Sequence, residues 1–136
     1  MINKIFIDTF AWIALINKSD NYHKLSVDLF NEILIKNNKL YTSTFIITET
    51  INALSKFMYR KPILEFLNRI QNSQILNLIE INMDIYNNSI NLFKKRIDKE
   101  WGLTDCSSFI VMEKYDIIKA FTNDKHFEQA GFELLI

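Results

Sequence analysis

The chain has 136 residues, of which 49% are apolar and 24% are charged, with 16 basic and 16 acidic side chains. This length and composition fit one globular domain with a buried core and exclude a disordered or collagen-like chain. Two Gly and one Pro are too few for the many turns of an all-β sandwich, and a single cysteine excludes an intramolecular disulfide framework and suits a reducing compartment.

The first predicted strand ends in a carboxylate. Lys4–Asp8 is a short apolar run that closes on Asp8, a pattern typical of a buried strand with a functional residue at its carboxyl end. A helix over Thr9–Ile16 follows at once. Apolar residues at helical spacing then predict a helix over Tyr22–Asn37, which stops at Asn37-Asn38 and packs one face on the sheet. The apolar positions of that helix are Leu25, Leu29, Phe30, Ile33 and Leu34.

The middle of the chain carries a carboxylate near the start of a helix. This helix begins at Ser43 or Thr44 and has apolar residues at helical intervals as far as Met58, so that Glu49 lies in one of its early turns. The other elements predicted here are a strand over Leu40–Thr42, a short amphipathic helix that begins at Pro62 and continues to Ile70, and a strand over Ile75–Ile81.

The second half places two more carboxylates at the ends of elements. Thr104-Asp105 has the chemistry of a helix start, and Asp124 follows a predicted strand over Ile117–Phe121. The other elements are a helix between Asp84 and Trp101, with Ile85, Ser89, Phe93 and Ile97 along one side, and a last short strand over Glu133–Ile136. Strands that alternate with helices predict a single α/β domain over residues 1–136, with a mostly parallel sheet covered on both faces.

The four carboxylates of Asp8, Glu49, Asp105 and Asp124 are predicted to face one end of this sheet, where ligands collect in such folds. Two carboxylates about 5 Å apart repel each other by about 3 kcal/mol at an effective dielectric constant near 20. A divalent metal relieves this repulsion, and all-oxygen ligation suits Mg²⁺ or Mn²⁺. One or two such ions activate a water and orient it in line with a phosphorus atom.

Each acid taken singly also fits a structural role. Asp8 suits a helix cap, Asp105 a first-turn acid favoured by the helix dipole, and Asp124 a turn residue. His126, after Asp124, is interpreted as an exposed turn residue rather than an RNA contact, and the two histidines lack partners at the spacing of a zinc site. Packing is the favoured role of Cys106, Trp12 and Trp101 over reactivity or base stacking.

The zero net charge argues at first against a nucleic-acid partner. If four acids are gathered around a metal, however, the rest of the chain carries a net charge of +4. Two basic clusters have two equally possible roles: they contact the phosphate backbone of a nucleic acid, or they form a solvated helix face. The clusters are Lys94, Lys95, Arg96 and Lys99, and Lys56, Arg60 and Lys61. The longest apolar run, Phe10–Ile16, is far shorter than the roughly 20 residues that span a bilayer. With Asp8 inside any signal-like segment, we expect a cytoplasmic protein without a membrane span.

Four stretches that contain these acids resemble the PIN-domain family, specifically the VapC-like toxin ribonucleases of bacterial toxin–antitoxin pairs. They are Phe6–Leu15 (FIDTFAWIAL), Thr48–Thr50 (TET), Leu103–Phe109 (LTDCSSF) and Thr122–Phe132 (TNDKHFEQAGF). They run in family order over nearly the whole chain. Phe10 departs from the small residue expected after Asp-Thr, which bears on the shape of the entrance to the site.

The resemblance implies a three-layer α/β/α domain that cleaves RNA endonucleolytically with Mg²⁺ or Mn²⁺ and without an organic cofactor. By the same resemblance Asp8, Glu49, Asp105 and Asp124 are the catalytic and metal-binding acids, and Thr9 and Ser108 are nearby polar groups that orient a ligand or water. The implied partners are an RNA substrate, a second copy of the chain in a homodimer, and a small antitoxin that covers the site.

Two rival functions stay open at this point. A phosphoryl-transfer enzyme of the haloacid-dehalogenase type would use Asp8 as nucleophile, although the second Asp two residues later is absent. A non-catalytic PIN-like module would bind RNA or a protein without cleaving it. Trapping of a phospho-aspartate favours the first, and tight RNA binding without metal-stimulated cleavage favours the second.

Overall fold

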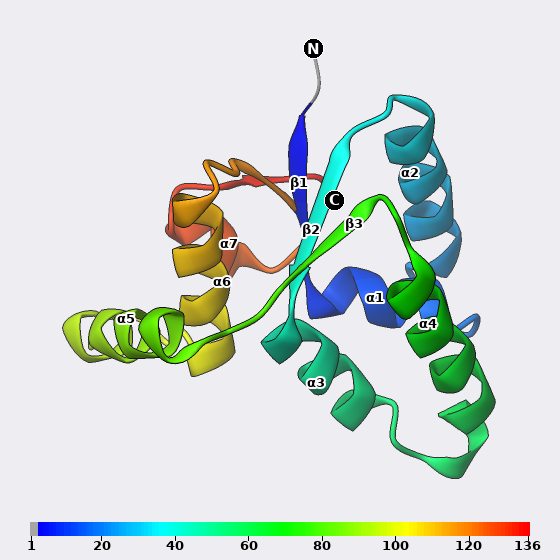
Figure 1. The fold of residues 1–136 in the computed structure, drawn as a ribbon, viewed down its shortest axis with the longest axis horizontal. Helices are drawn as coiled ribbons and strands as arrows, with labels where there is room; N and C mark the ends of the chain where they lie inside the picture. Colours follow the sequence, from blue (N-terminus) through cyan, green and yellow to red (C-terminus); the bar gives the residue numbers. More distant parts are fainter. Residues whose placement is uncertain (1–2) are drawn as a thin grey trace.

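The computed structural model describes residues 3–136, so the first two residues of the predicted domain lie outside it. Five parallel strands form one sheet in the order β3-β2-β1-β4-β5, seen nearly edge-on in Figure 1. The strands are β1 (Lys4–Ile7), β2 (Lys39–Ser43), β3 (Leu76–Ile79), β4 (Lys119–Phe121) and β5 (Glu133–Leu134). The predicted α/β class is confirmed, and the sheet is parallel throughout.

Helices cover both faces of the sheet and make three layers (Figure 1). On one side lie α1 (Thr9–Ile16), α2 (His23–Ile35) and α4 (Arg60–Asn72), and on the other lie α5 (Met83–Lys95), α6 (Leu103–Lys114) and α7 (Lys125–Gln129). The remaining helix, α3 (Thr44–Ala53), contacts α1 and α6 at the carboxyl edge of the sheet. Within residues 3–136, no helix combines the length and apolar character of a transbilayer segment.

The central strand β1 forms the middle of the core. Phe6 and Ile7 are fully buried, as are Ala120 and Phe121 of the neighbouring strand. Because Ile7 lies opposite Phe121 in the parallel register, the residues that follow these strands emerge side by side at one edge. The backbone N–H of Asp8 still donates to the carbonyl of Phe121, at 3.4 Å. The fold therefore brings Asp8 next to the segment that begins at Thr122.

Several predicted helix ends are wrong in position. The helix that carries Glu49 ends at Ala53 and not at Met58, which lies in the 3-10 turn Phe57–Tyr59, because the chain must reverse into α4. Pro62, predicted to begin its helix, is the third residue of α4. Proline is tolerated there because the backbone N–H groups of the first turn have no partner within the helix. α5 ends at Lys95, so Ile97 lies beyond it and is 91% exposed, contrary to its predicted place on the apolar side.

The left-handed backbone of Asn37 ends α2 as predicted. Asn37 has φ +57°, a conformation that Asn tolerates better than most residues. The next residue, Asn38, donates its side-chain amide to the carbonyl of Ile33, which satisfies one of the last carbonyls of the helix. On the predicted apolar face Ile33 is buried, but Leu25 is half exposed.

Candidate active site

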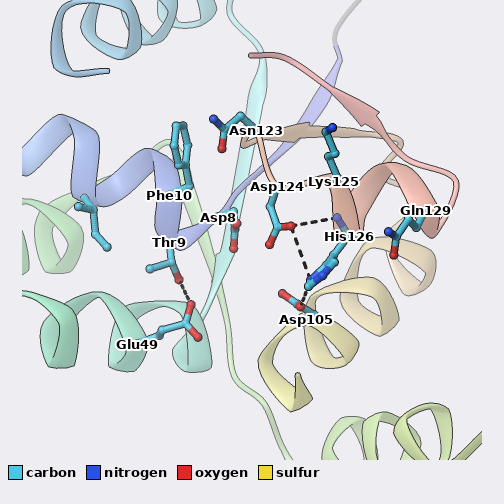
Figure 2. A pocket seen from close by; sticks show the side chains of 11 residues that line it. Asp8, Thr9, Phe10, Glu49, Asp105, Asn123, Asp124, Lys125, His126 and Gln129 are labelled. Carbon is cyan, nitrogen blue, oxygen red and sulfur yellow. Dashed lines mark hydrogen bonds and ion pairs between the residues drawn. The ribbon is translucent and has the colours of Figure 1, made fainter. Parts of the chain in front are cut away.

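All four predicted acids line one cavity of about 740 Å³ at the carboxyl edge of the sheet. Asp8 follows β1, Glu49 lies in α3, Asp105 lies in the first turn of α6, and Asp124 follows β4. Figure 2 shows their carboxylates converging from these four elements. The topology explains the convergence, because the carboxyl ends of adjacent parallel strands and the helix starts beyond them share one edge of the sheet.

Asp8 is a buried carboxylate held by a single side-chain partner. Only 6% of the residue is exposed, and its Oδ2 accepts a hydrogen bond from the hydroxyl of Thr122 at 2.9 Å. Burial raises the pKa of Asp8 from its ordinary value of 3.8 to about 7, although the Thr122 hydrogen bond opposes the shift and the charges of Asp105 and Glu49 add to it. Asp8 caps α1 only through its backbone, since its side chain makes no cap hydrogen bond.

Thr122 also fixes the position of Asp124. Its Oγ1 accepts the backbone N–H of Asp124 at 3.1 Å while it donates to Asp8. Asp124 in turn is the side-chain N-cap of α7, because its Oδ1 accepts the backbone N–H of His126 at 2.9 Å. One hydroxyl thus ties two of the four acids together.

His126 joins Asp124 to Asp105. Its Nδ1 lies 2.8 Å from Oδ2 of Asp105 and 3.6 Å from Oδ1 of Asp124. The hydrogen bond to Asp105 raises the pKa of His126 above its ordinary value, whereas desolvation raises the pKa of Asp105 and the histidine partly offsets this. The backbone N–H of Gly102, the N-cap residue of α6, also donates to Oδ2 of Asp105, at 3.3 Å. The interpretation of His126 as an exposed turn residue is therefore wrong.

Glu49 is the exposed member of the four acids. It accepts a 2.5 Å hydrogen bond at Oε1 from the hydroxyl of Thr9, the first residue of α1. This bond connects α3 to the helix that Asp8 precedes, and it places Thr9 beside the acids. Oε2 of Glu49 makes no hydrogen bond within residues 3–136, and the residue lines the cavity beside Thr9 (Figure 2).

The donor set suits a divalent cation. One ligand atom each from Asp105, Asp124 and His126 lie within 4.8 Å of one another, and the buried carboxylate of Asp8 lines the same cavity. In the described part of the chain, Oδ1 of Asp105 and Oδ2 of Asp124 make no hydrogen bond, so oxygen atoms remain for a metal. Carboxylate oxygens are the ligands that Mg²⁺ and Mn²⁺ prefer, and Asp8 and Glu49 extend the set beyond the tight group.

Ser108 does not join the cavity. It lies one turn after Asp105 in α6, is fully buried, and its hydroxyl has no hydrogen-bond partner within residues 3–136. Trp12 and Trp101 are each 5% exposed, and their indole N–H groups donate to Thr42 and Gln129. Both tryptophans therefore pack, as favoured, and neither offers a face to RNA.

Six residues that line the cavity are not among the site residues predicted from the sequence: Phe10, Ile13, Asn123, Lys125, His126 and Gln129. Gln129 is oriented by Trp101, whose indole donates to its Oε1 at 2.9 Å. Four of the six lie within two residues of a predicted acid in the chain, Ile13 is one turn of α1 beyond Phe10, and Gln129 is one turn of α7 beyond His126. The proximity of these residues to Asp8 and Asp124 in the sequence was the signal that could have found them.

Comparison with known proteins assigns the architecture. A family model described as the PIN domain matches residues 5–133. A 23S rRNA-specific endonuclease from Mycobacterium tuberculosis, VapC20, is 27% identical over 128 residues, which are 94% of this chain and 95% of that protein.

Solved structures agree with this comparison. The crystal structure of VapC20, described as a sarcin-ricin loop cleaving toxin, superposes with a TM-score of 0.85 at 26% identity, covering 94% of this chain and 95% of that one. FitAcB from Neisseria gonorrhoeae gives a TM-score of 0.70 at 14% identity, with 97% and 96% coverage. VapBC2 from Rickettsia felis, bound to a DNA fragment from its promoter, gives a TM-score of 0.66 at 17% identity, with 96% coverage of both chains. The last two show similarity of fold.

Proposed function

The chain belongs to the PIN-domain family, and from that premise we propose that it is a metal-dependent endoribonuclease that hydrolyses RNA phosphodiester bonds at the acidic cavity. The observation that carries this proposal is the convergence of four carboxylates from four elements in one cavity. Similarity to VapC20 over nearly the whole of both chains supports RNA as the substrate class.

We propose that Asp8, Asp105 and Asp124 hold Mg²⁺ or Mn²⁺, and that Glu49 completes the set or positions the attacking water. A bound divalent ion would supply Lewis-acid polarisation of the phosphate and a water of lowered pKa. The raised pKa of Asp8 supports this assignment, because burial among other acids disfavours the charged carboxylate and a nearby cation would favour it.

The chain's own residues keep the acids in place. Thr122 donates to Asp8, and His126 donates from its backbone to Asp124 and from Nδ1 to Asp105. These hydrogen bonds occupy one oxygen of each of the three carboxylates and so fix the rotation of each carboxylate group. Partners of this kind orient metal ligands, and their loss costs about 10- to 100-fold in metal affinity or activity. We therefore assign His126 and Thr122 as positioning residues.

A positive charge beside the cavity fits an anionic polymer such as RNA. Lys125 lines the cavity mouth and is exposed, so its ammonium group is free to meet a phosphate next to the scissile one. Gln129, held by Trp101, offers amide N–H groups on the same side. Among the predicted basic clusters, Arg96 instead forms an ion pair with Asp98 and stacks over Trp101.

We propose three further features of the biological unit. By analogy with the VapBC and FitAB complexes among the similar structures, the chain is the toxin of a pair and is inhibited by a small antitoxin protein. We also retain a homodimer and a cytoplasmic location as proposals. A short reading frame for a small DNA-binding protein beside the gene would support the first.

The experiment that tests the function is incubation of the purified protein with total RNA in the presence of Mg²⁺, Mn²⁺ or a chelator, followed by mapping of the cut ends. The proposal expects discrete cuts with metal, none with chelator, and none with Asp105→Asn. Tight RNA binding without cleavage under any metal would replace the proposal with the non-catalytic binding module.

A further inference from the structure

The aromatic pair Phe10 and Tyr22 has no part in the core. Neither ring belongs to the buried cluster between the layers or to the partly buried residues packed against it. Phe10 instead lines the acidic cavity, two residues after Asp8. Apart from Ile13, the other residues that line this cavity are polar or charged. Phe10 is therefore a large apolar side chain at the edge of a mainly polar and anionic cavity.

We propose that Phe10, supported by Tyr22, is a stacking platform for an unpaired base of the RNA next to the scissile phosphate. This inference rests on the function proposed above and adds a substrate-binding subsite to it. Aromatic side chains stack on any base because every base has a π face. Single-stranded RNA, whose bases can splay out of the chain, is the substrate form that this platform fits.

The Phe10 ring already packs against an aromatic neighbour before any ligand binds. The ring centroids of Phe10 and Tyr22 lie 5.0 Å apart at an interplanar angle of 67°, a favourable edge-to-face arrangement. The backbone of Tyr22 is held in place, because its N–H donates to the carboxylate of Asp20 at 2.8 Å. A ring held in this way loses little freedom when a base stacks on it, which favours binding.

The position of the ring relative to the acids selects a nucleotide over other flat ligands. In Figure 2, Phe10 rises from α1 on one side of Asp8, whereas His126 and Asp105 lie on the other side. A ligand that reaches both the Phe10 ring and the acids must carry a flat apolar group and, a short distance away, an anion that a metal held by the acids can bind. A nucleoside joined to its phosphate has both groups.

The test compares RNA affinity in an Asp105→Asn background, which keeps the RNA intact. Fluorescein-labelled single-stranded oligoribonucleotides of mixed sequence are titrated with this protein and with versions that also carry Phe10→Leu or Phe10→Tyr. Leu keeps an apolar side chain but removes the π face, and Tyr retains it. We expect Phe10→Leu to weaken binding by about tenfold and Phe10→Tyr to bind as the background does.

Salt dependence separates stacking from a general disturbance of the site. Since stacking releases no counterions, Phe10→Leu should weaken binding by the same factor at low and at high salt, whereas Lys125→Ala should reduce the slope of affinity against salt. Thermal unfolding of each variant checks that it is folded. Unchanged affinity of Phe10→Leu, or equal weakening by Leu and Tyr, overturns the platform.

Failure of the platform and failure of the proposed function give different results. If the unmodified protein does not cut RNA with Mg²⁺ or Mn²⁺, the nuclease proposal fails, while the binding comparison still decides the role of Phe10. If the unmodified protein cuts RNA and Phe10→Leu binds and cuts as well as it does, only the platform fails.

Discussion

Replacement of Asp8 by Asn should stabilise the metal-free protein at neutral pH. Asn has the same shape and keeps an acceptor for the Thr122 hydroxyl, which donates to Oδ2 of Asp8, but it carries no charge to desolvate. A rise in the pKa of Asp8 from 3.8 to about 7 corresponds to about 4 kcal/mol, at about 1.4 kcal/mol for each pKa unit. This is the upper limit of the gain.

Proton linkage makes the stability advantage of Asp8→Asn grow as the pH rises. Because the pKa of Asp8 in the folded protein is raised, the stability gained from its protonation is fully present below 3.8 and is lost as the pH rises to about 7. The free energies of unfolding of the two proteins should therefore agree at about pH 4 and diverge in favour of Asp8→Asn by about pH 8.

Urea unfolding in a chelator over this pH range measures the difference. Asp84→Asn, in the exposed first turn of α5, removes the same charge far from burial and should give no pH-dependent gain. Saturating Mg²⁺ should reduce or reverse the advantage of Asp8→Asn, because a ligand that binds only the folded state stabilises it. An Asp8→Asn protein that is less stable than the original at every pH would refute the reasoning.

Three further predictions concern the other site residues. Asp105→Asn should abolish RNA cleavage in a gel assay while the protein stays folded, since Asn still accepts from His126 and Gly102; cleavage at the original rate would remove Asp105 from the mechanism. His126→Ala should weaken Mn²⁺ uptake about 10- to 100-fold in calorimetry, whereas His126→Asn, whose amide nitrogen can replace Nδ1, should retain most of it; equal loss in both would contradict the positioning role. Thr9→Val removes the hydroxyl that donates to Glu49, so it should lower the cleavage rate and leave metal uptake nearly unchanged. A large loss of metal uptake would show instead that Glu49 is a primary metal ligand.

The sheet and the four acids could be predicted because strong local signals marked them. The short apolar runs around Phe6 and Ala120 are buried on both faces, as strands of a covered parallel sheet must be. An acid directly after such a run lies at the carboxyl edge whatever the details of packing. The positions of Asp8 and Asp124 therefore followed from strand direction alone.

The parts that could not be predicted depend on contacts between distant segments. α7 is five residues long and has too few turns for helical periodicity to show, so His126 was placed in a turn. α6 is buried nearly all round, with Cys106, Phe109, Val111 and Met112 among its buried residues, and such a helix has no polar face that distinguishes cavity from core. For that reason the sequence could not show that Ser108 is fully buried and does not line the cavity.

The central claim is that carboxylates from segments far apart in the chain, Asp8, Asp105 and Asp124 among them, together bind a divalent cation. Isothermal titration of the chelator-treated protein with Mn²⁺ tests it most directly, with the Asp8→Asn, Asp105→Asn double variant as the matched control. We expect saturable uptake by the original protein and its loss in the double variant. No uptake by the original protein, or equal uptake by both, would contradict it.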